Sequence, residues 1–390
     1  MLGSIQNTKA LGSMVFARIV YALNWMNVGA IFFLMTSDLN TDVSGLGFVT
    51  ATFYLGIGIL QVPGGLLAAK YGPKKVVVAG IFLFSLAALG TSFVSTIAEL
   101  AALRFVVGAG MAFVFAPGIV IISRLIRGEK SGIGVGLFNS AFDIGGLVAL
   151  FGWVIVATMT GWRLSLAVSG GLGVVTGLLV MVLVPRDEVR AEFRVSLRPL
   201  VNILKDRHMI LFGVALLGFD FGNTIISGFM IYYLANAEGV SGAVAGAVTS
   251  LITIVPIFAA LVAGRLYDTR KDHRQLVTIA LLGSAVALAL ASFPTLYTAA
   301  ASSALGGVVS AIGYTFGFAG ARDLNREGKE YEGLAISWVN SIHLTGSFIP
   351  PVLFSFIVET LGYAQAWLWS AALTLVFLGP MLLMAKTWRD

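Results

Sequence analysis

The chain has 390 residues, of which 58% are hydrophobic and only 11% are charged, and its net charge is +6. A soluble domain carries about 25% charged residues, so this composition excludes a protein whose whole surface faces water. Cysteine is absent, which excludes disulfides, thiolate metal sites and Cys-based redox motifs. The basic excess does not indicate a nucleic-acid partner, because the Lys and Arg residues of membrane proteins collect on one side of the bilayer.

Long apolar stretches follow one another along almost the whole sequence. Each is close to the length of about 20 residues that a helix needs to cross a bilayer. The stretches are continuously apolar rather than alternating, so they predict helices and not the strands of a barrel. The sequence therefore predicts an all-α membrane protein with twelve spans, at 14–36, 44–69, 74–95, 98–126, 132–158, 162–185, 209–236, 241–266, 274–294, 296–321, 331–358 and 363–387.

The basic residues predict the orientation in the membrane. If the N-terminus is cytoplasmic, every Lys and Arg except Arg18, Arg104 and Arg163 falls in an inner loop, in a tail or at the inner end of a span. Inner loops are the ones that carry the positive charge in membrane proteins. We therefore expect a multi-pass protein of the cell membrane with both termini in the cytoplasm.

The longest polar break divides the spans into two groups of six. The predicted parts are an N-terminal bundle (1–185), a cytoplasmic linker (186–208) and a C-terminal bundle (209–390). Within the linker, apolar residues recur at helical spacing among basic ones: Leu197, Leu200, Val201 and Leu204. This pattern predicts an amphipathic helix on the inner leaflet that couples the bundles, and a passive tether is the alternative.

The two groups of spans are related in sequence. Residues 139–145 in span five read Asn-Ser-Ala-Phe-Asp-Ile-Gly, and residues 340–346 in span eleven read Asn-Ser-Ile-His-Leu-Thr-Gly. The segment that ends span two, from Gly65, also resembles the segment that ends span eight, from Gly264. The two segments are separated by nearly the same number of residues as 139–145 and 340–346. Because each unit has an even number of spans, the two units have the same orientation and form a parallel repeat.

The loop after span two carries a motif. It reads Gly-Leu-Leu-Ala-Ala-Lys-Tyr-Gly-Pro-Lys-Lys over residues 65–75. With the twelve spans and the parallel repeat, this loop resembles the signature loop of the major facilitator superfamily, and the resemblance covers essentially the full chain. The family has an acidic residue where this chain has Ala69. We therefore expect the charge contacts by which this loop holds the first half together to be weaker.

The resemblance implies two parallel-related six-helix halves that bind substrate near the bilayer midplane and work by alternating access. It also implies gating roles for motif residues in both halves: Gly65, Lys70, Gly72, Lys74 and Lys75 in the first, and Gly264 and Asp268 in the second.

Ionisable residues inside the spans are the candidates for function. Such a group costs at least about 2.5–3.5 kcal/mol at the bilayer centre and usually faces a cavity or a partner. Asp143, Asp220 and His343 each lie about 16–18 Å from the inner end of their predicted span, and Asn24 lies at a similar depth. This layer is where the family resemblance places the substrate site.

Asp220 is the first candidate for proton coupling, because Asn223 follows at i+3 on the same helix face. Asp143 is the second, either as a coupling group or as a packing group between the halves. Burial favours the protonated acid and a nearby cation favours the carboxylate, so a carboxylate that changes partners can take up and release a proton.

His343 can titrate or ligate a metal, and a packing role with Asn340 at i−3 is its alternative. Tyr314 is the aromatic residue best placed to line a cavity. Arg104 lies near the outer boundary, where its guanidinium can bind an anion or act as a hydrogen-bonding post for neighbouring helices. Arg18 lies near the start of span one, so we expect it to snorkel to the inner surface, with a cavity face as the alternative.

These residues predict a monomeric secondary transporter, not an enzyme, that moves a small polar organic solute coupled to protons. Arg104 favours an anionic solute. The expected partners of the transporter are the substrate, protons and membrane lipids, with no metal or other cofactor. The rival predictions within transport are a carrier of cations or divalent metals and a uniporter. Outside transport they are a lipid pathway like that of a scramblase and a membrane receptor.

Overall fold

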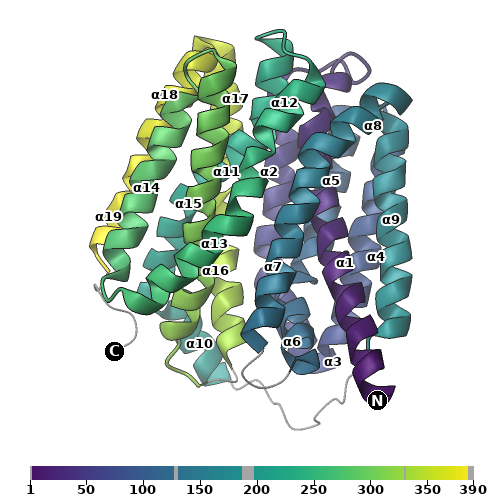
Figure 1. Cartoon of the computed structure of the whole chain (residues 1–390), viewed down its shortest axis with the longest axis vertical. Helices are drawn as coiled ribbons and strands as arrows, with labels where there is room; N and C mark the ends of the chain where they lie inside the picture. Colours follow the sequence, from purple (N-terminus) through teal and green to yellow (C-terminus); the bar gives the residue numbers. More distant parts are fainter. Residues whose placement is uncertain (1, 127–130, 187–196, 329–330, 385–390) are drawn as a thin grey trace.

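The computed structural model describes residues 2–126, 131–186, 197–328 and 331–384, and in these residues it contains helices and no strand (Figure 1). Twelve helical segments are long and apolar enough to cross a membrane, so the predicted fold class and number of spans are confirmed. The first of them, Asn7–Leu34, begins seven residues earlier than the sequence predicted.

The first six spans precede residue 186. Three of them are made of two consecutive α-helices. Their elements are α1 (Leu2–Ile31) and η1 (Phe32–Leu34); α2 (Val43–Ile59) and α3 (Gln61–Tyr71); α4 (Pro73–Gly90) and η2 (Thr91–Phe93); α5 (Ile97–Ala112) and α6 (Phe115–Leu125); α7 (Ser131–Leu147), the π-helical η4 (Val148–Gly152) and α8 (Trp153–Thr160); and α9 (Trp162–Leu183).

The last six spans begin after the short helix α10 (Leu197–Lys205). Spans eight and eleven are interrupted, as are spans two and five, which correspond to them in the first half. The elements are α11 (Arg207–Asn236); α12 (Gly242–Thr249) and α13 (Leu251–Thr269); α14 (His273–Leu290); α15 (Leu296–Asp323); α16 (Glu332–Gly346) and α17 (Ile349–Leu361); and α18 (Tyr363–Thr374), η6 (Leu375–Phe377) and α19 (Leu378–Leu382).

Local chemistry explains where several spans begin. Asp206 accepts a hydrogen bond from the backbone N–H of Met209 and so caps α11. Thr96 and Glu99 form a capping box at the start of α5. The sixth and twelfth spans each follow a glycine with positive φ, Gly161 at 86° and Gly362 at 83°, in a conformation that other residues rarely adopt.

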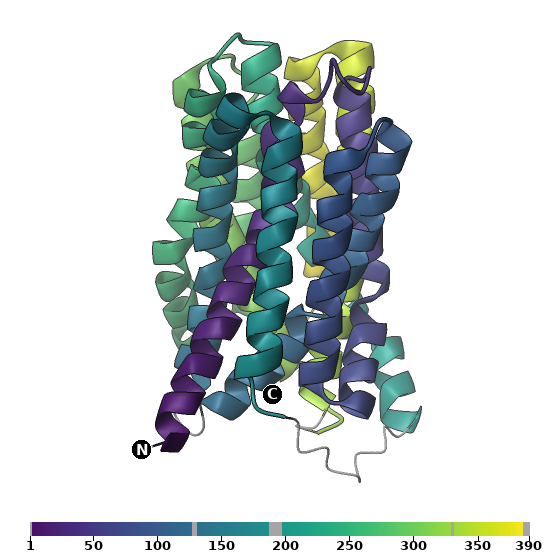
Figure 2. The same ribbon diagram turned by 90° about the vertical axis from the view of Figure 1, so that its right-hand side faces the viewer.

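The two groups of six spans stand side by side, and the helices run roughly parallel to the long axis of the molecule (Figures 1 and 2). The chain enters α1 and leaves α19 at the same end of the molecule. The groups meet where α2 packs on α16 and α17, where α7 packs on α13, and where α1 packs on α11.

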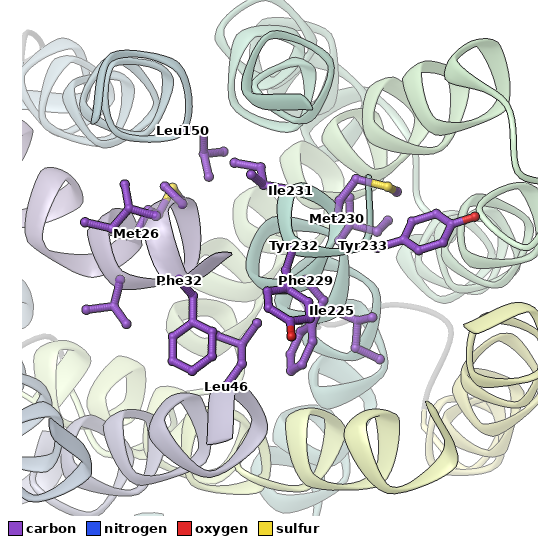
Figure 3. Packing of buried hydrophobic residues seen from close by; sticks show 14 of the residues in the cluster. Met26, Phe32, Leu46, Leu150, Ile225, Phe229, Met230, Ile231, Tyr232 and Tyr233 are labelled. Atoms are coloured by element: carbon purple, nitrogen blue, oxygen red, sulfur yellow. The ribbon is translucent and has the colours of Figure 1, made fainter. Parts of the chain in front are cut away.

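The end of the molecule away from the termini is closed by an apolar cluster that both groups share (Figure 3). Phe32 and Leu46 of the first group meet Phe229 and Tyr232 of α11, and the Phe32 and Tyr232 rings lie 5.9 Å apart. At the other end the buried apolar residues form two clusters, one mainly in each group. Hydrophobic packing therefore joins the groups most continuously at the end away from the termini.

A helix is present where the linker pattern predicted one. α10 packs against α11 and α16, and Ile203 is buried there, whereas Val201 is exposed. Residues 187–196 of the linker lie outside the described residues. A position of α10 on the inner leaflet stays a prediction.

Glycines allow α2 and α5 to pack in close contact. A Cβ atom at Gly108 would lie 2.2 Å from the carbonyl oxygen of Phe53, and one at Gly56 would lie 2.1 Å from that of Phe105. Both neighbours are backbone atoms that cannot move without shifting a helix. Small residues at such contacts are the usual basis of helix packing in membranes.

We expect Gly108→Ala to lower the thermal stability of the purified protein, because the methyl group forces α2 and α5 apart. Overpacking of this kind costs about 1–3 kcal/mol. The matched control is Gly171→Ala on α9, where an added Cβ has nothing within 4 Å. Equal melting temperatures for the two variants would contradict the close packing.

Candidate functional site

Four ionisable side chains lie in one layer of the molecule. Counted from the first residue of their helices, Asp143, Asp220 and His343 lie about 16–20 Å along the helix axis, and Arg18 lies about 16 Å from the start of its span at Asn7. This is near the middle of a hydrocarbon core of about 30 Å. The layer contains the three ionisable residues that the sequence predicted there, and the structure adds Arg18. Asn24, which the sequence also placed there, lies about 26 Å from the start of its span.

Asp220 of α11 pairs with His343 of α16. Its Oδ2 atom contacts Nδ1 of His343 and accepts a hydrogen bond of 3.1 Å from the hydroxyl of Ser347. The other ring nitrogen of His343, Nε2, lies 3.0 Å from Oδ1 of Asn340. The side chains of Asp220 and His343 are only 3% and 5% exposed, so water does not replace these partners.

This arrangement places one proton between Asp220 and His343. An amide oxygen can only accept, so Nε2 of His343 donates to Asn340. Nδ1 is then left facing the Asp220 carboxyl, and the contact needs a proton on one of the two atoms. The pair is neutral overall whichever atom holds that proton, and a second proton or the loss of the first would leave a buried net charge.

The network extends from Asp220 to α15. The hydroxyl of Tyr314 donates to Oδ1 of Asp220 over 3.2 Å and accepts from the Asn223 amide over 3.0 Å. Ser310 donates to Oδ1 of Asn223 over 3.2 Å. The predicted residues Asp220, Asn223, Asn340, His343 and Tyr314 are therefore brought together by three helices of the second half.

Two hydrogen bonds and a small cavity link this region to the first half. Ser341 of α16 donates to the carbonyl oxygen of Gly58 over 2.8 Å. Thr224, one turn after Asp220, donates to the hydroxyl of Tyr54 over 3.1 Å. A cavity of about 30 Å³ lies between α1, α2, α5 and α11. Pockets for small organic ligands measure about 300–1,000 Å³, so the helices must separate to admit one here. The cavity is lined by Trp25, Met26, Val28, Gly29, Val49, Thr50, Phe53, Tyr54, Arg104, Thr224, Ser227 and Gly228.

Arg104 holds α1 in place. Its two terminal nitrogens donate to the carbonyl oxygens of Asn24 and Trp25 over 2.8 and 2.9 Å. The Asn24 carbonyl is available because the N–H of Val28, which would normally bond to it, donates to Oδ1 of Asn27. These contacts support the hydrogen-bonding alternative for Arg104, although the residue also lines the cavity.

Asn24 is also used in packing. Its amide donates to the carbonyl oxygen of Ser169 over 3.2 Å, and its Oδ1 accepts from the Ser169 hydroxyl over 2.9 Å. Both ends of the side chain therefore tie α1 to α9, away from the Asp220 network.

Arg18 is buried, at 7% exposure, and the prediction that it snorkels to the inner surface is wrong. The reason is the start of the first span: α1 extends back to Leu2, so Arg18 lies in the middle of the helix rather than near its end. Its guanidinium carbon is 4.5 Å from the ring centre of Tyr21 and 4.6 Å from that of Phe142.

Asp143 lies near Arg18 but not in the Asp220 network. It is partly buried on α7 and interacts electrostatically with Arg18, and in the described part of the chain no hydrogen bond to its side chain is formed. No three His, Cys, Asp or Glu residues among those described are placed to hold a metal ion together. The described residues thus offer no ligand set for the divalent-metal rival.

The predicted gating residues lie at the ends of spans two and eight. Gly72 has φ 92° and joins α3 to α4, and Lys74 donates to the carbonyl oxygen of Val184 at the end of α9. Lys70 lies 5.0 Å from the Tyr71 ring, and Lys75 follows in α4.

A Cβ atom at Gly65 would lie 3.2 Å from the hydroxyl of Ser337, whereas one at Gly264 would have open space around it. Asp268 is exposed near the end of α13. Their gating roles stay predictions.

The sequence analysis missed three polar residues of the site. Thr224 lies at i+4 from Asp220, Ser347 lies at i+4 from His343, and both follow from helical periodicity. Tyr54, which receives the hydrogen bond from Thr224, belongs to α2, and no local pattern links the two.

Twelve apolar helices around a buried polar layer define a multi-pass membrane protein. The sequence profile of the Major Facilitator Superfamily matches residues 14–222 and 212–390. The chain belongs to the major facilitator superfamily, and it is a transporter rather than an enzyme.

Three curated relatives are similar in sequence. An uncharacterised MFS-type transporter of Methanocaldococcus jannaschii is 26% identical over 85% of this chain and 86% of its own. A probable galactarate/D-glucarate transporter of Escherichia coli is 31% identical over 37% of this chain and 34% of its own. A niacin transporter of Acinetobacter baylyi is 27% identical over 43% of this chain and 40% of its own.

The fold is also found in solved structures. A crystal structure of the nucleoside transporter NupG superposes with a TM-score of 0.78 at 14% identity, covering 96% of this chain and 99% of that one. A bacterial homologue of the human lysosomal transporter Spinster gives a TM-score of 0.75, also at 14% identity, over 95% of this chain and 94% of that one.

We expect Tyr54→Phe to favour separation of the halves, because it removes the hydrogen bond between Tyr54 and Thr224. The loss of about 1 kcal/mol corresponds to about a five-fold shift between two states. Spin labels on Ser95→Cys and Thr360→Cys, in a chain without other cysteines, report the distance between the halves. Tyr71→Phe, at an exposed position, is the control, and an unchanged distance distribution in Tyr54→Phe would contradict the expectation.

Proposed function

We propose that the protein is a secondary transporter that moves a small polar organic anion across the cell membrane by alternating access coupled to protons. The observation that carries the proposal is the buried pair of Asp220 and His343, which shares a proton in the central layer. The first half supplies a cation, Arg18, in the same layer. The second half supplies the group that exchanges a proton.

The relatives support an anionic substrate. Galactarate, D-glucarate and niacin, which the names of two relatives specify, are organic acids. The chemistry of the central layer agrees, because a buried guanidinium binds a carboxylate more readily than a neutral or cationic group.

The charge of the layer supports proton coupling. The Asp220–His343 pair is neutral with one proton, so it adds no charge to compete with Arg18 for the substrate. When the site opens to one side and water enters, hydration lowers the free-energy cost of charging the carboxylate and the imidazole independently of each other. The pair then exchanges its protons with that side.

The packing of the halves supports alternating access. The shared apolar cluster closes the end away from the termini, and the hydrogen bond between Tyr54 and Thr224 joins the halves beneath it. Rocking the halves about this contact would open one end while the other closes. A uniport mechanism uses the same motion without a titrating group.

Replacing Asp220 with Asn should abolish proton-driven accumulation of the solute, because the amide has the size of the protonated acid and cannot titrate. Exchange of solute across equal gradients should survive. The assay measures uptake into proteoliposomes with and without an imposed pH gradient. Asp143→Asn is the second variant to test, because Asp143 lies beside Arg18.

The control is Asp42→Asn at the start of α2. The hydrogen bond from the Ser44 side chain, and then backbone bonds, hold the pKa of the Asp42 carboxyl below its usual range, so this group stays ionised throughout the neutral range. Asn caps a helix as well as Asp does, so neither stability nor the pH dependence of transport should change. If Asp220→Asn and Asp143→Asn both accumulate solute with the wild-type pH dependence, the protein is a uniporter.

The orientation can be tested directly because the chain has no cysteine. With both termini in the cytoplasm, Ser95→Cys should react with an impermeant maleimide on intact cells. Lys271→Cys should react only after the cells are permeabilised. Both positions are exposed, and the reverse labelling pattern would overturn the orientation.

A further inference from the structure

The guanidinium of Arg18 lies among four aromatic rings. Its Cζ atom is 4.5–5.2 Å from the ring centres of Tyr21, Phe115, Phe138 and Phe142, which come from α1, α6 and α7. We call these four rings the Arg18 cage. Ring faces attract a cation, so the cage stabilises the positive charge of Arg18 away from water.

The cage leaves hydrogen-bond donors of Arg18 without acceptors. A guanidinium carries five N–H donors arranged in a planar fork. The Nε and Nη1 atoms of Arg18 are buried and have no hydrogen-bond partner among the described residues. Nor does a hydrogen bond join Arg18 to Asp143 in the described part of the chain, although the two interact electrostatically. An oxyanion with two oxygen atoms is the group that would complete this site.

An aromatic seam leads from the Arg18 cage to the cavity. The ring of Trp25 lies 5.8 Å from that of Tyr21 and 5.6 Å from that of Phe142. On its other side it lies 5.7 Å from Tyr54 and 4.9 Å from Phe53, which line the cavity. A ligand held at Arg18 would therefore have mainly aromatic rings along this direction.

We infer that Arg18 is the subsite for the substrate's carboxylate and that the substrate is an aromatic monocarboxylate, whose ring packs on the seam around Trp25. The inference rests on the proposed function and narrows its substrate class. A bidentate contact would satisfy the donors of Arg18, and edge-to-face contacts would hold the ring.

The electrostatics of the region favour one carboxylate rather than two. Arg18 and Arg104 are the two arginines buried in the described spans, and Arg104 already donates to the carbonyl oxygens of Asn24 and Trp25. A second carboxylate would have to break those bonds to find a cation. Tyr314 lies within electrostatic range of Arg18 and its hydroxyl contacts Asp220, so a carboxylate bound at Arg18 would approach that hydroxyl.

The test measures binding of benzoate to the purified full-length protein at neutral pH. Benzoate should raise the thermal stability of the wild type in a saturable manner, whereas benzamide, which has the same ring and no charge, should not. Arg18→Lys keeps the charge but removes the fork, and it should weaken benzoate binding at least roughly ten-fold. Arg163→Lys makes the same change at an exposed position and should bind as the wild type does.

The outcomes separate the inference from the proposed function. If D-glucarate stabilises the protein and benzoate does not, or if Arg18→Lys binds benzoate like the wild type, the inference is overturned and anion transport stands. If benzoate binding depends on Arg18 but a pH gradient drives no accumulation, the inference stands and proton coupling is overturned. If no carboxylate binds, both are overturned.

A second measurement covers the case in which Arg18→Lys does not fold. Benzoate seated on the seam should change the fluorescence of Trp25 in the wild-type protein, and the saturable change should disappear in Trp25→Phe. Benzamide should leave the fluorescence unchanged. No saturable change in the wild type, or the same change in Trp25→Phe, would overturn the inference.

Discussion

A charge inside a membrane protein needs a partner within the protein, and this constraint organises the centre of the molecule. Arg104 meets it with backbone carbonyl groups of α1, and Asp220 meets it with His343. Arg18 meets it only in part, because aromatic faces stabilise its charge but accept none of its buried Nε and Nη1 donors. Arg18 therefore has two unpartnered donor nitrogens that a ligand can complete, whereas Arg104 leaves only its Nε without a partner and Asp220 is paired.

The position of Tyr314 explains how binding and protonation could be coupled. Its hydroxyl contacts Asp220 in the second half, and it lies within electrostatic range of Arg18 in the first. A ligand can shift a conformational equilibrium only by the difference between its affinities for the two states. Under the proposed function, a carboxylate between Arg18 and Tyr314 would touch both halves only when they are together, so it would bind the closed state more tightly. Opening would then weaken the site and hydrate the Asp220–His343 pair in the same movement.

Hydrophobicity and helical periodicity were enough to predict the twelve spans and the shared face of Asp220 and Asn223. They were not enough for Arg18, because the start of a span is poorly defined by composition. An error of seven residues along a helix moves a side chain by about 10 Å, which is the difference between the membrane surface and its middle. The pairing of Asp220 with His343 joins residues from separate helices, so no local pattern could reveal it. The phenylalanines of the Arg18 cage look in the sequence like any that face lipid.

The related segments 139–145 and 340–346 show how one packing scheme can serve two kinds of chemistry. Their last glycines are both in close contact with the first helix of their own half: a Cβ at Gly145 would lie 2.4 Å from the carbonyl oxygen of Ile19, and one at Gly346 would lie 2.5 Å from the Leu217 side chain. Three positions earlier the segments differ, with Phe142 in the Arg18 cage and His343 paired with Asp220. The shared glycine contacts keep both helices in place. The difference between a ring face and an imidazole therefore changes the chemistry at the centre of the molecule and not the packing of the helices. Under the proposed function, this charge asymmetry between two similarly packed halves would allow one half to bind an anion while the other exchanges a proton.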